Sequence, residues 1–262
     1  MYEELYEPLP DRELYLKRLQ LEAAGNLNVE YLDRLIVAHQ FRIPFENLDI
    51  FELEKRIDLS TQSLFDKIIL KKRGGYCFEL NALFDRLLCE LGYQAYPCSS
   101  RILRGKDFIP PALHRGILVL VQGQTWFCDV GYGGPMPGGA LLVEDGYEKT
   151  CCRQTFRIER SDEYWWTVVY LSGGRQEKIL QFTLMPQEPV DFLAPNEYCS
   201  RNENSVFLKQ RMVNRRTADG SLSIVNDTFS QISNRQRAEK KIQSPEELNQ
   251  ILNNYFGIHL AE

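Results

Sequence analysis

The chain has 262 residues, enough for one large domain or for two to three small ones. Hydrophobic residues make up 44% of it and charged residues 26%, a mixture typical of globular proteins, which excludes a disordered or fibrous chain. The formal net charge is −5 and the basic residues are spread along the chain, which argues against nucleic acid as the main partner but leaves room for a local basic patch that binds an anionic cofactor.

The N-terminal segment, residues 1–14, has neither the basic nor the apolar stretch of a signal peptide, so we expect a cytoplasmic protein. The longest apolar runs, residues 117–121 and 164–171, are far shorter than the ~18 residues that a membrane span needs. The seven cysteines are scattered without CxxC pairs, and adjacent Cys151 and Cys152 are poorly placed to bridge each other. This usage predicts reduced thiols and no metal site.

Helical periodicity dominates the first ninety residues. Three helices are predicted over residues 12–23, 28–41 and 60–72. A fourth is predicted over residues 77–91, with Gly92 as the glycine that ends it. His39 lies on the apolar stripe of the second helix, so we interpret it as a core histidine with a local hydrogen-bond partner.

Beyond residue 92 the pattern changes to short runs rich in β-branched and aromatic residues, which predict antiparallel strands of a small barrel or sandwich. The runs cover residues 94–103, 116–121, 124–130, 155–159, 164–171 and 177–184. A hairpin at residues 217–220 and a final helix follow; Ser244 is the expected N-cap of this helix, Pro245 its first residue and Gly257 its end. This order predicts an α+β fold. Its three parts are residues 1–92, 93–190 and 191–262.

Cys77 begins the fourth helix and faces the core in its first turn. Most free cysteines are buried hydrophobes. Here Gly74 and Gly75 allow a close approach of the backbone, and the helix N-terminus together with Arg73 would favour a thiolate. Cys77 is therefore a candidate nucleophile.

A nucleophilic cysteine needs a base, and the chain has three histidines. His259 follows the last helix, where a surface position is expected, which leaves His114. His114 begins a strand whose hairpin partner carries Asp129, a carboxylate that needs a partner at the end of an apolar strand. A turn at Gln122-Gly123 makes the two diagonal neighbours, about 7 to 8 Å apart. A turn one residue later separates them by about 13 Å, so only the first register builds a triad.

The glycine-rich loop at residues 131–139 matches no phosphate-binding fingerprint.

Four motifs follow one another at compatible spacings. They are RIPFENLDI (42–50), RGGYCFELN (73–81), LHRGILVLV (113–121) and DVGYGG (129–134). With these motifs the chain resembles the arylamine N-acetyltransferase family over nearly its whole length, most strongly over residues 10–135. RGGYCFELN is the most specific of the four.

The resemblance implies a helical bundle, an antiparallel β-barrel and a C-terminal α/β lid around a core like that of cysteine proteases. It implies that Cys77 is the acetyl-accepting nucleophile, His114 its base and Asp129 the residue that orients the imidazole. Acetyl-CoA is the implied co-substrate: it acylates Cys77, CoA leaves, and the nitrogen of an arylamine or hydrazine takes the acetyl group in a ping-pong reaction.

The resemblance also implies the surroundings of the triad. The aromatic acceptor pocket would be formed by Phe45, Ile102 and Tyr132. Contacts with CoA would come from Gly133, Gly134 and Ser205. The segment 199–211 departs from the family pattern, in which an aromatic or basic residue is frequent there. Glu46 and Arg73 match a buried ion pair that supports the cysteine loop, and a role as substrate ligands is the alternative.

Three other functions stay open. An amide synthase of the same family would use the same triad to cyclise an acyl chain on a polyketide carrier, and a thiol acyl-hydrolase would pass the acyl group to water. An idle binding protein on this scaffold would do neither. The physiological acceptor, the preferred acyl chain, a role in xenobiotic metabolism or in biosynthesis, and the oligomeric state are not encoded in readable motifs. No membrane or nucleic-acid partner is expected.

Overall fold

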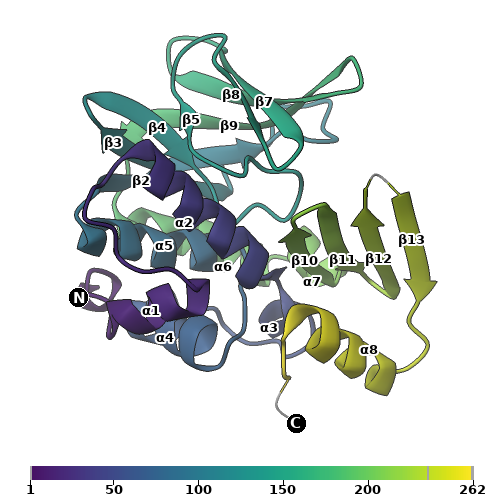
Figure 1. The fold of residues 1–262 in the computed structure, drawn as a ribbon. Coiled ribbons are helices and arrows are strands. Elements are labelled where there is room, and N and C mark those ends of the chain that lie inside the picture. The colour runs from purple at the N-terminus through teal and green to yellow at the C-terminus, as the bar shows by residue number, and fades with distance from the viewer. Residues whose placement is uncertain (1, 235, 261–262) are drawn as a thin grey trace.

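The computed structural model describes residues 2–234 and 236–260. Helices pack beside a large antiparallel sheet, and a smaller sheet with the last helix lies at the C-terminal, yellow-green end of the molecule (Figure 1). The predicted α+β class is confirmed. Within the described residues, no helix combines the length and the apolar character that crossing a membrane requires.

Helices build the N-terminal third. Asp11 and Asn28 cap the first two long helices by accepting the N–H groups of the third residue beyond each. The first helix is shorter than predicted because Gln20 takes a left-handed conformation with φ 55°. The helical elements are η1 Glu3–Leu5, α1 Arg12–Leu19, α2 Val29–Arg42, α3 Leu48–Phe51, α4 Thr61–Phe65 with its π-helical extension η2 Asp66–Leu70, and α5 Cys77–Leu91.

Helix α5 is the central helix of the molecule. It contacts α1, α4 and the strands β2 (Gln94–Ile102) and β3 (His114–Val121), and most of its residues are buried. Gly92, at φ 102°, ends it as predicted. The start of α5 is therefore held in a fixed place inside the fold.

Eight antiparallel strands form the large sheet, in the order β5-β4-β3-β2-β9-β8-β7-β6. The strands beyond β2 and β3 are β4 Gln124–Cys128, β5 Leu141–Leu142, β6 Glu148–Cys151, β7 Gln154–Arg160, β8 Trp165–Ser172 and β9 Arg175–Pro186. Strand β5 also contacts β7, so the sheet curls toward a barrel. All six predicted strands are present. Strands β5 and β6 were not predicted, because runs this short carry too little alternation to be recognised.

The β3–β4 hairpin turns at Gln122-Gly123, so the register that directs His114 toward Asp129 is confirmed. Gln122 and Gly123 both have positive φ, 52° and 77°, as the preferred type I′ hairpin turn requires. The turn was ambiguous in the sequence because its first residue is not the usual Asn or Asp.

The smaller sheet joins the C-terminal segment to a strand from the N-terminal third. Its order is β1 Phe45–Glu46, β10 Met212–Thr217, β11 Gly220–Val225, β12 Thr228–Ser233 and β13 Gln236–Lys241. The remaining helices are η3 Pro189–Phe192, α6 Leu193–Arg201, α7 Val206–Lys209 and α8 Pro245–Ile251 with its π-helical extension η4 Leu252–Phe256. The predicted hairpin at 217–220 and the last helix with its Ser244 cap and Gly257 end are confirmed; β12 and β13 were not predicted.

Candidate active site

Cys77 is the first residue of α5 and is almost completely buried. The two glycines before it permit close contact with the N-terminal motif. A methyl group at Gly74 would lie 1.9 Å from the carbonyl oxygen of Pro44, and Gly75 forms a parallel bridge with Phe45. The expected close approach of the backbone is thus confirmed, and it ties the cysteine loop to β1.

The prediction that the helix N-terminus and Arg73 favour a thiolate at Cys77 was wrong. We expected Arg73 to favour a thiolate, but its guanidinium pairs with Glu46 at 2.8 Å and with Asp49 at 3.0 Å, which neutralises its charge. Burial raises the pKa of the Cys77 thiol well above its usual value. Deprotonation of this thiol therefore requires transfer of the proton to a neighbouring base.

Glu46 and Arg73 form the buried ion pair that the resemblance implied. Neither residue lines the cavity into which Cys77 opens, so the alternative role as substrate ligands has no support from the geometry.

His114 and Asp129 form a buried hydrogen-bonded pair. Nε2 of His114 lies 2.7 Å from Oδ2 of Asp129, which leaves Nδ1 as the ring nitrogen available to the thiol of Cys77. The ring of Tyr132 meets the imidazole edge to face, with 6.2 Å between the ring centres. Burial raises the pKa of Tyr132 to about 12, so its hydroxyl stays neutral.

Asn81 is a residue of this site to which the sequence assigned no role. It lies four residues after Cys77 on the same face of α5. Its Nδ2 donates to Oδ1 of Asp129 at 2.9 Å and to the carbonyl of Arg115 at 2.6 Å, and its Oδ1 accepts the N–H of Val130 at 2.9 Å. The available signal was an amide on an otherwise apolar helix face, because a buried amide needs partners.

Neutral donors also hold the rest of the Asp129 segment. The N–H of Gly131 donates to Oδ1 of Asp129 at 2.8 Å, and Gln40 donates to the carbonyls of Asp129 and Pro137 at 3.2 and 2.8 Å. A methyl group at Gly131 would lie 2.7 Å from the Cα of Cys77, so glycine is required there. Gln40 was also missed, since nothing in its sequence neighbourhood distinguishes it from other polar helix residues.

Cys77 and His114 open into a cavity of about 490 Å³. All six residues that the resemblance placed around the triad line it: Phe45, Ile102, Tyr132, Gly133, Gly134 and Ser205. The N-terminal motif, the large sheet and the C-terminal segment all contribute to its walls. Among the described residues that line the cavity no carboxylate occurs. Lys106 provides positive charge, and the second cation, Arg104, also pairs with Glu177 at 3.0 Å.

Two of these lining residues make contacts within the protein: Ser205 forms hydrogen bonds, and Gly133 packs against an aromatic ring. The hydroxyl of Ser205 donates to the carbonyl of Cys199 and accepts the N–H of Phe207 at 3.2 Å, so it caps the short helix α7. Gly133 lies against the ring of Phe45, where a methyl group would come within 2.7 Å of it.

The other two histidines lie outside this site. His39 is buried in the core, where its Nε2 lies 3.1 Å from the hydroxyl of Tyr15, and burial lowers its pKa to about 3. The predicted core role of His39 is confirmed. His259 is exposed, as expected.

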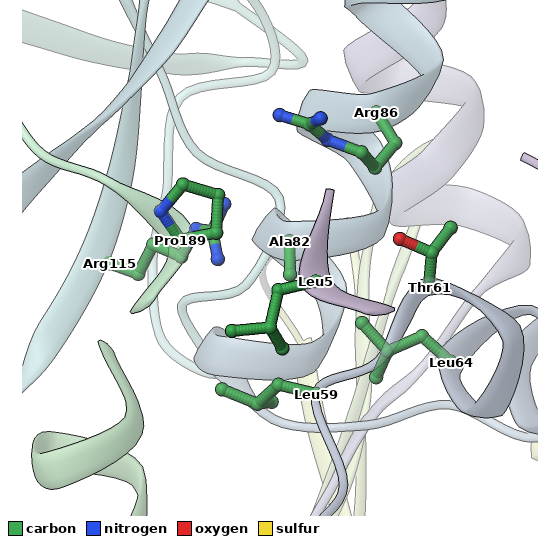
Figure 2. A pocket seen from close by; sticks show the side chains of 8 residues that line it. All are labelled: Leu5, Leu59, Thr61, Leu64, Ala82, Arg86, Arg115 and Pro189. Atoms are coloured by element: carbon green, nitrogen blue, oxygen red, sulfur yellow. The ribbon is translucent and has the colours of Figure 1, made fainter. Parts of the chain in front are cut away.

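A second cavity, of about 10 Å³, shares no lining residue with the first. In Figure 2, Arg115 and Pro189 lie on one side of Leu5, and Thr61 and Leu64 lie on the other. The remaining lining residues are Leu59, Ala82 and Arg86. A space of this size holds no more than one water molecule, so it is no substrate site.

An α+β fold whose main cavity brings together a buried cysteine and a histidine paired with an aspartate is the architecture of an enzyme that transfers or hydrolyses acyl groups through a thioester. The profile of the N-acetyltransferase family matches residues 28–262. The chain is 30% identical to the arylamine N-acetyltransferase / N-hydroxyarylamine O-acetyltransferase of Salmonella typhimurium and 29% identical to the arylamine N-acetyltransferase of Escherichia coli, covering 93% of this chain and 87% of each relative. The protein belongs to the arylamine N-acetyltransferase family, as its motifs indicated.

Solved structures agree with this assignment. The arylamine N-acetyltransferase from Salmonella typhimurium superimposes with a TM-score of 0.91 at 27% identity, over 98% of this chain and 94% of that one. The Mycobacterium smegmatis enzyme gives 0.89 at 27% identity, over 95% and 93%. The Mycobacterium marinum enzyme in complex with CoA shares the fold, with a TM-score of 0.88 at 24% identity over 95% and 93%.

Proposed function

We propose that the protein transfers an acetyl group from acetyl-CoA, through an acetyl-Cys77 intermediate, to the nitrogen of an arylamine or hydrazine. The observation that carries this proposal is that Cys77 and the hydrogen-bonded His114–Asp129 pair meet at one cavity in a chain of this family. In our proposal residues 1–92 supply the nucleophile, 93–190 the base and the acid, and 191–262 the lid over the cavity.

In the donor half-reaction, Nδ1 of His114 takes the thiol proton of Cys77 while Asp129 holds Nε2–H. The sulfur then attacks the thioester carbonyl, and CoA leaves with the proton from His114. Because burial raises the pKa of the free thiol, the pair supplies what the helix N-terminus alone does not: a base beside the sulfur and a carboxylate that stabilises the imidazolium.

In the acceptor half-reaction, the amine enters the same cavity and attacks the acetyl carbonyl. His114 takes a proton from the nitrogen, the C–S bond to Cys77 breaks, and His114 returns the proton to the departing sulfur. Phe45, Ile102 and Tyr132 offer apolar and aromatic surface on which an aromatic amine can stack. A cavity of about 490 Å³ is within the range of small-molecule sites.

The CoA moiety has its best match at the side of the cavity that carries Lys106 and Arg104. The charge of Lys106 suits the CoA phosphates, and Arg104 would contact them in addition to its ion pair with Glu177. We assign Gly133, Gly134 and Ser205 to the same contact. The solved CoA complex of a relative with this fold supports CoA as the carrier of the acyl group.

Intact-protein mass spectrometry tests the proposal. Mixing with acetyl-CoA should add one acetyl group on Cys77, and adding a simple aniline should remove it with formation of acetanilide. The Cys77→Ala variant should gain no acetyl group and should lose all turnover while keeping its fold. Decay of the acetyl-enzyme to acetate without amine would instead indicate a hydrolase. Folded wild-type protein that acetyl-CoA does not acylate would contradict the proposal and favour a carrier-bound acyl donor.

A further inference from the structure

Cys152 lies at the tip of the β6–β7 hairpin and does not line the active-site cavity. Cys151 pairs with Gln154, so Cys152 and Arg153 form a two-residue turn with φ values of 49° and 62°. Neither residue is of the glycine, asparagine or aspartate type that such turns prefer. The turn presents the Cys152 side chain at a partly exposed position.

Arg216 on strand β10 lies beneath this turn and is only 9% exposed. Its Nη2 donates to the carbonyl of Met136 and to the side chain of Gln154. Its Nη1 is buried and has no hydrogen-bond partner among the described residues. A methyl group at Gly138 would lie 2.6 Å from this Nη1 and 2.9 Å from Sγ of Cys152, so the sulfur and the unpartnered nitrogen converge on the same point.

This arrangement has a chemical consequence. Peroxides add an oxygen atom to a reactive cysteine sulfur, and a guanidinium beside that sulfur is placed to donate a hydrogen bond to the added oxygen. A buried N–H without a partner costs free energy until an acceptor reaches it. An oxygen atom bonded to Sγ of Cys152 would be such an acceptor.

We propose that Cys152 is a site of reversible oxidation by hydroperoxides and that Arg216 holds the oxidised product. The thiolate sulfur attacks one oxygen of the peroxide: an S–O bond forms, the O–O bond breaks, and the electron pair leaves with the other oxygen as hydroxide or alkoxide. The sulfur loses two electrons, the peroxide gains them, and the sulfenic oxygen accepts a hydrogen bond from Nη1 of Arg216. Two low-molecular-weight thiols reverse the change: the first forms a mixed disulfide and releases water, and the second exchanges with it to free Cys152.

The chain contains its own reference thiols. Cys89 is more exposed than Cys152, and Cys151 is its direct neighbour with the same class of exposure. Burial raises the pKa of both reference thiols. If exposure alone set the rate of oxidation, Cys89 would be oxidised first, because it is the most exposed of the three. The proposal instead predicts that Cys152 is oxidised first.

The experiment uses the full-length Cys77→Ala protein, so that the proposed nucleophile does not compete for the oxidant. Protein is treated with hydrogen peroxide in the presence of dimedone, and the adduct on each cysteine is followed by peptide mass spectrometry. Cys152 should be labelled about tenfold faster than Cys89 or Cys151, and added thiol should suppress the labelling. Equal or slower labelling of Cys152 would overturn the proposal without any variant at Arg216.

Variants then test the guanidinium. Arg216→Gln should lower the labelling rate of Cys152 about tenfold, Arg216→Lys should keep most of it, and the neighbouring Arg215→Gln should leave it unchanged. Circular dichroism and the thermal midpoint establish that each variant is folded. If folded Arg216→Gln and Arg215→Gln proteins are labelled at the same rate, Arg216 does not hold the product and the proposal is wrong.

Discussion

Two largely buried polar clusters meet at the start of α5, and they are built on different principles. We call the first the ion cluster; its members are Glu46, Asp49, Lys67, Arg73 and Glu79. We call the second the triad cluster; its members are Cys77, Asn81, His114 and Asp129. One cluster supports the cysteine loop, and the other supplies the chemistry that we propose.

In the ion cluster, carboxylates form ion pairs with lysine and arginine side chains. Nζ of Lys67 lies 2.8 Å from Asp49 and 2.7 Å from Glu79, and Arg73 pairs with Glu46. Glu79 also accepts the N–H of Tyr76 at 3.0 Å, so the cluster is bonded directly to the loop. Paired buried charges hold their neighbours in place, but each charge is compensated by its partner and is not available to stabilise a charge elsewhere.

In the triad cluster, the single carboxylate, Asp129, accepts hydrogen bonds from neutral donors. Asn81 and the N–H of Gly131 donate to Oδ1 of Asp129, and no Lys or Arg forms an ion pair with this carboxylate among the described residues. In the mechanism that we propose, this carboxylate is therefore available to stabilise the cation that forms when His114 takes a proton. The difference teaches that this fold pairs carboxylates with cations where it needs rigidity, and leaves one carboxylate without a Lys or Arg partner where our mechanism needs a base.

The strongest test of this comparison removes that single charge. Asp129→Asn keeps the shape of the side chain but should lower kcat about 10⁴-fold, because the imidazole loses its stabilising charge and takes the wrong tautomer. Steady-state acetyl transfer to an aniline measures the effect. Asp107→Asn, on an exposed loop, is the matched control and should leave kcat unchanged. A near-native rate for Asp129→Asn would remove Asp129 from the mechanism.

The second test breaks the ion cluster. Arg73→Met leaves Glu46 and Asp49 with one cation fewer and should reduce the free energy of unfolding by about 3–5 kcal/mol, because an uncompensated buried charge is costly. Urea denaturation measures this loss. Arg12→Met breaks an exposed ion pair with Glu13 and should cost less than about 1 kcal/mol. Equal losses in the two variants would mean that burial of the cluster contributes nothing.

A smaller effect is expected from Asn81→Ala, which removes one donor to Asp129. Loss of a hydrogen bond to a charged group predicts a fall in kcat of about 10- to 100-fold with little change in KM. Because Asn81 would act through Asp129, the same change should have almost no further effect on kcat in the Asp129→Asn protein. Full additivity of the two losses would show that Asn81 has a purely structural role.

The smallest effect concerns pH. Burial raises the pKa of Glu79 from 4.5 to about 7, against the opposing effect of Lys67. A carboxyl group with a raised pKa in the folded state contributes most stability below its unfolded pKa, and this contribution is lost as pH rises from about 4.5 to about 7. Glu79→Gln removes this dependence, so the unfolding free energy of wild type should fall relative to the variant by about 1–3 kcal/mol between pH 5 and 8. Parallel pH profiles in urea denaturation would contradict the assignment.

Much of the fold was readable because its signals are local. The apolar stripe of α5, its Gly92 end and the Ser244 cap of α8 each depend on residues within a few positions of one another. The short strands β5 and β6 and the highly polar β13 were missed, because they carry little or no hydrophobic alternation.

In the candidate site, too, some features follow from local sequence and others from the packing of distant residues. By itself, the sequence determined that Cys77 starts a helix after two glycines, that His114 is the remaining histidine for a base, and which family motifs surround them. Only the tertiary structure decided the hairpin register that pairs His114 with Asp129, the attachment of Asn81 to that pair, and the diversion of Arg73 into the ion cluster. The physical reason is that hydrogen-bond partners, desolvation and charge compensation depend on which distant residues pack together, and no local pattern contains that information.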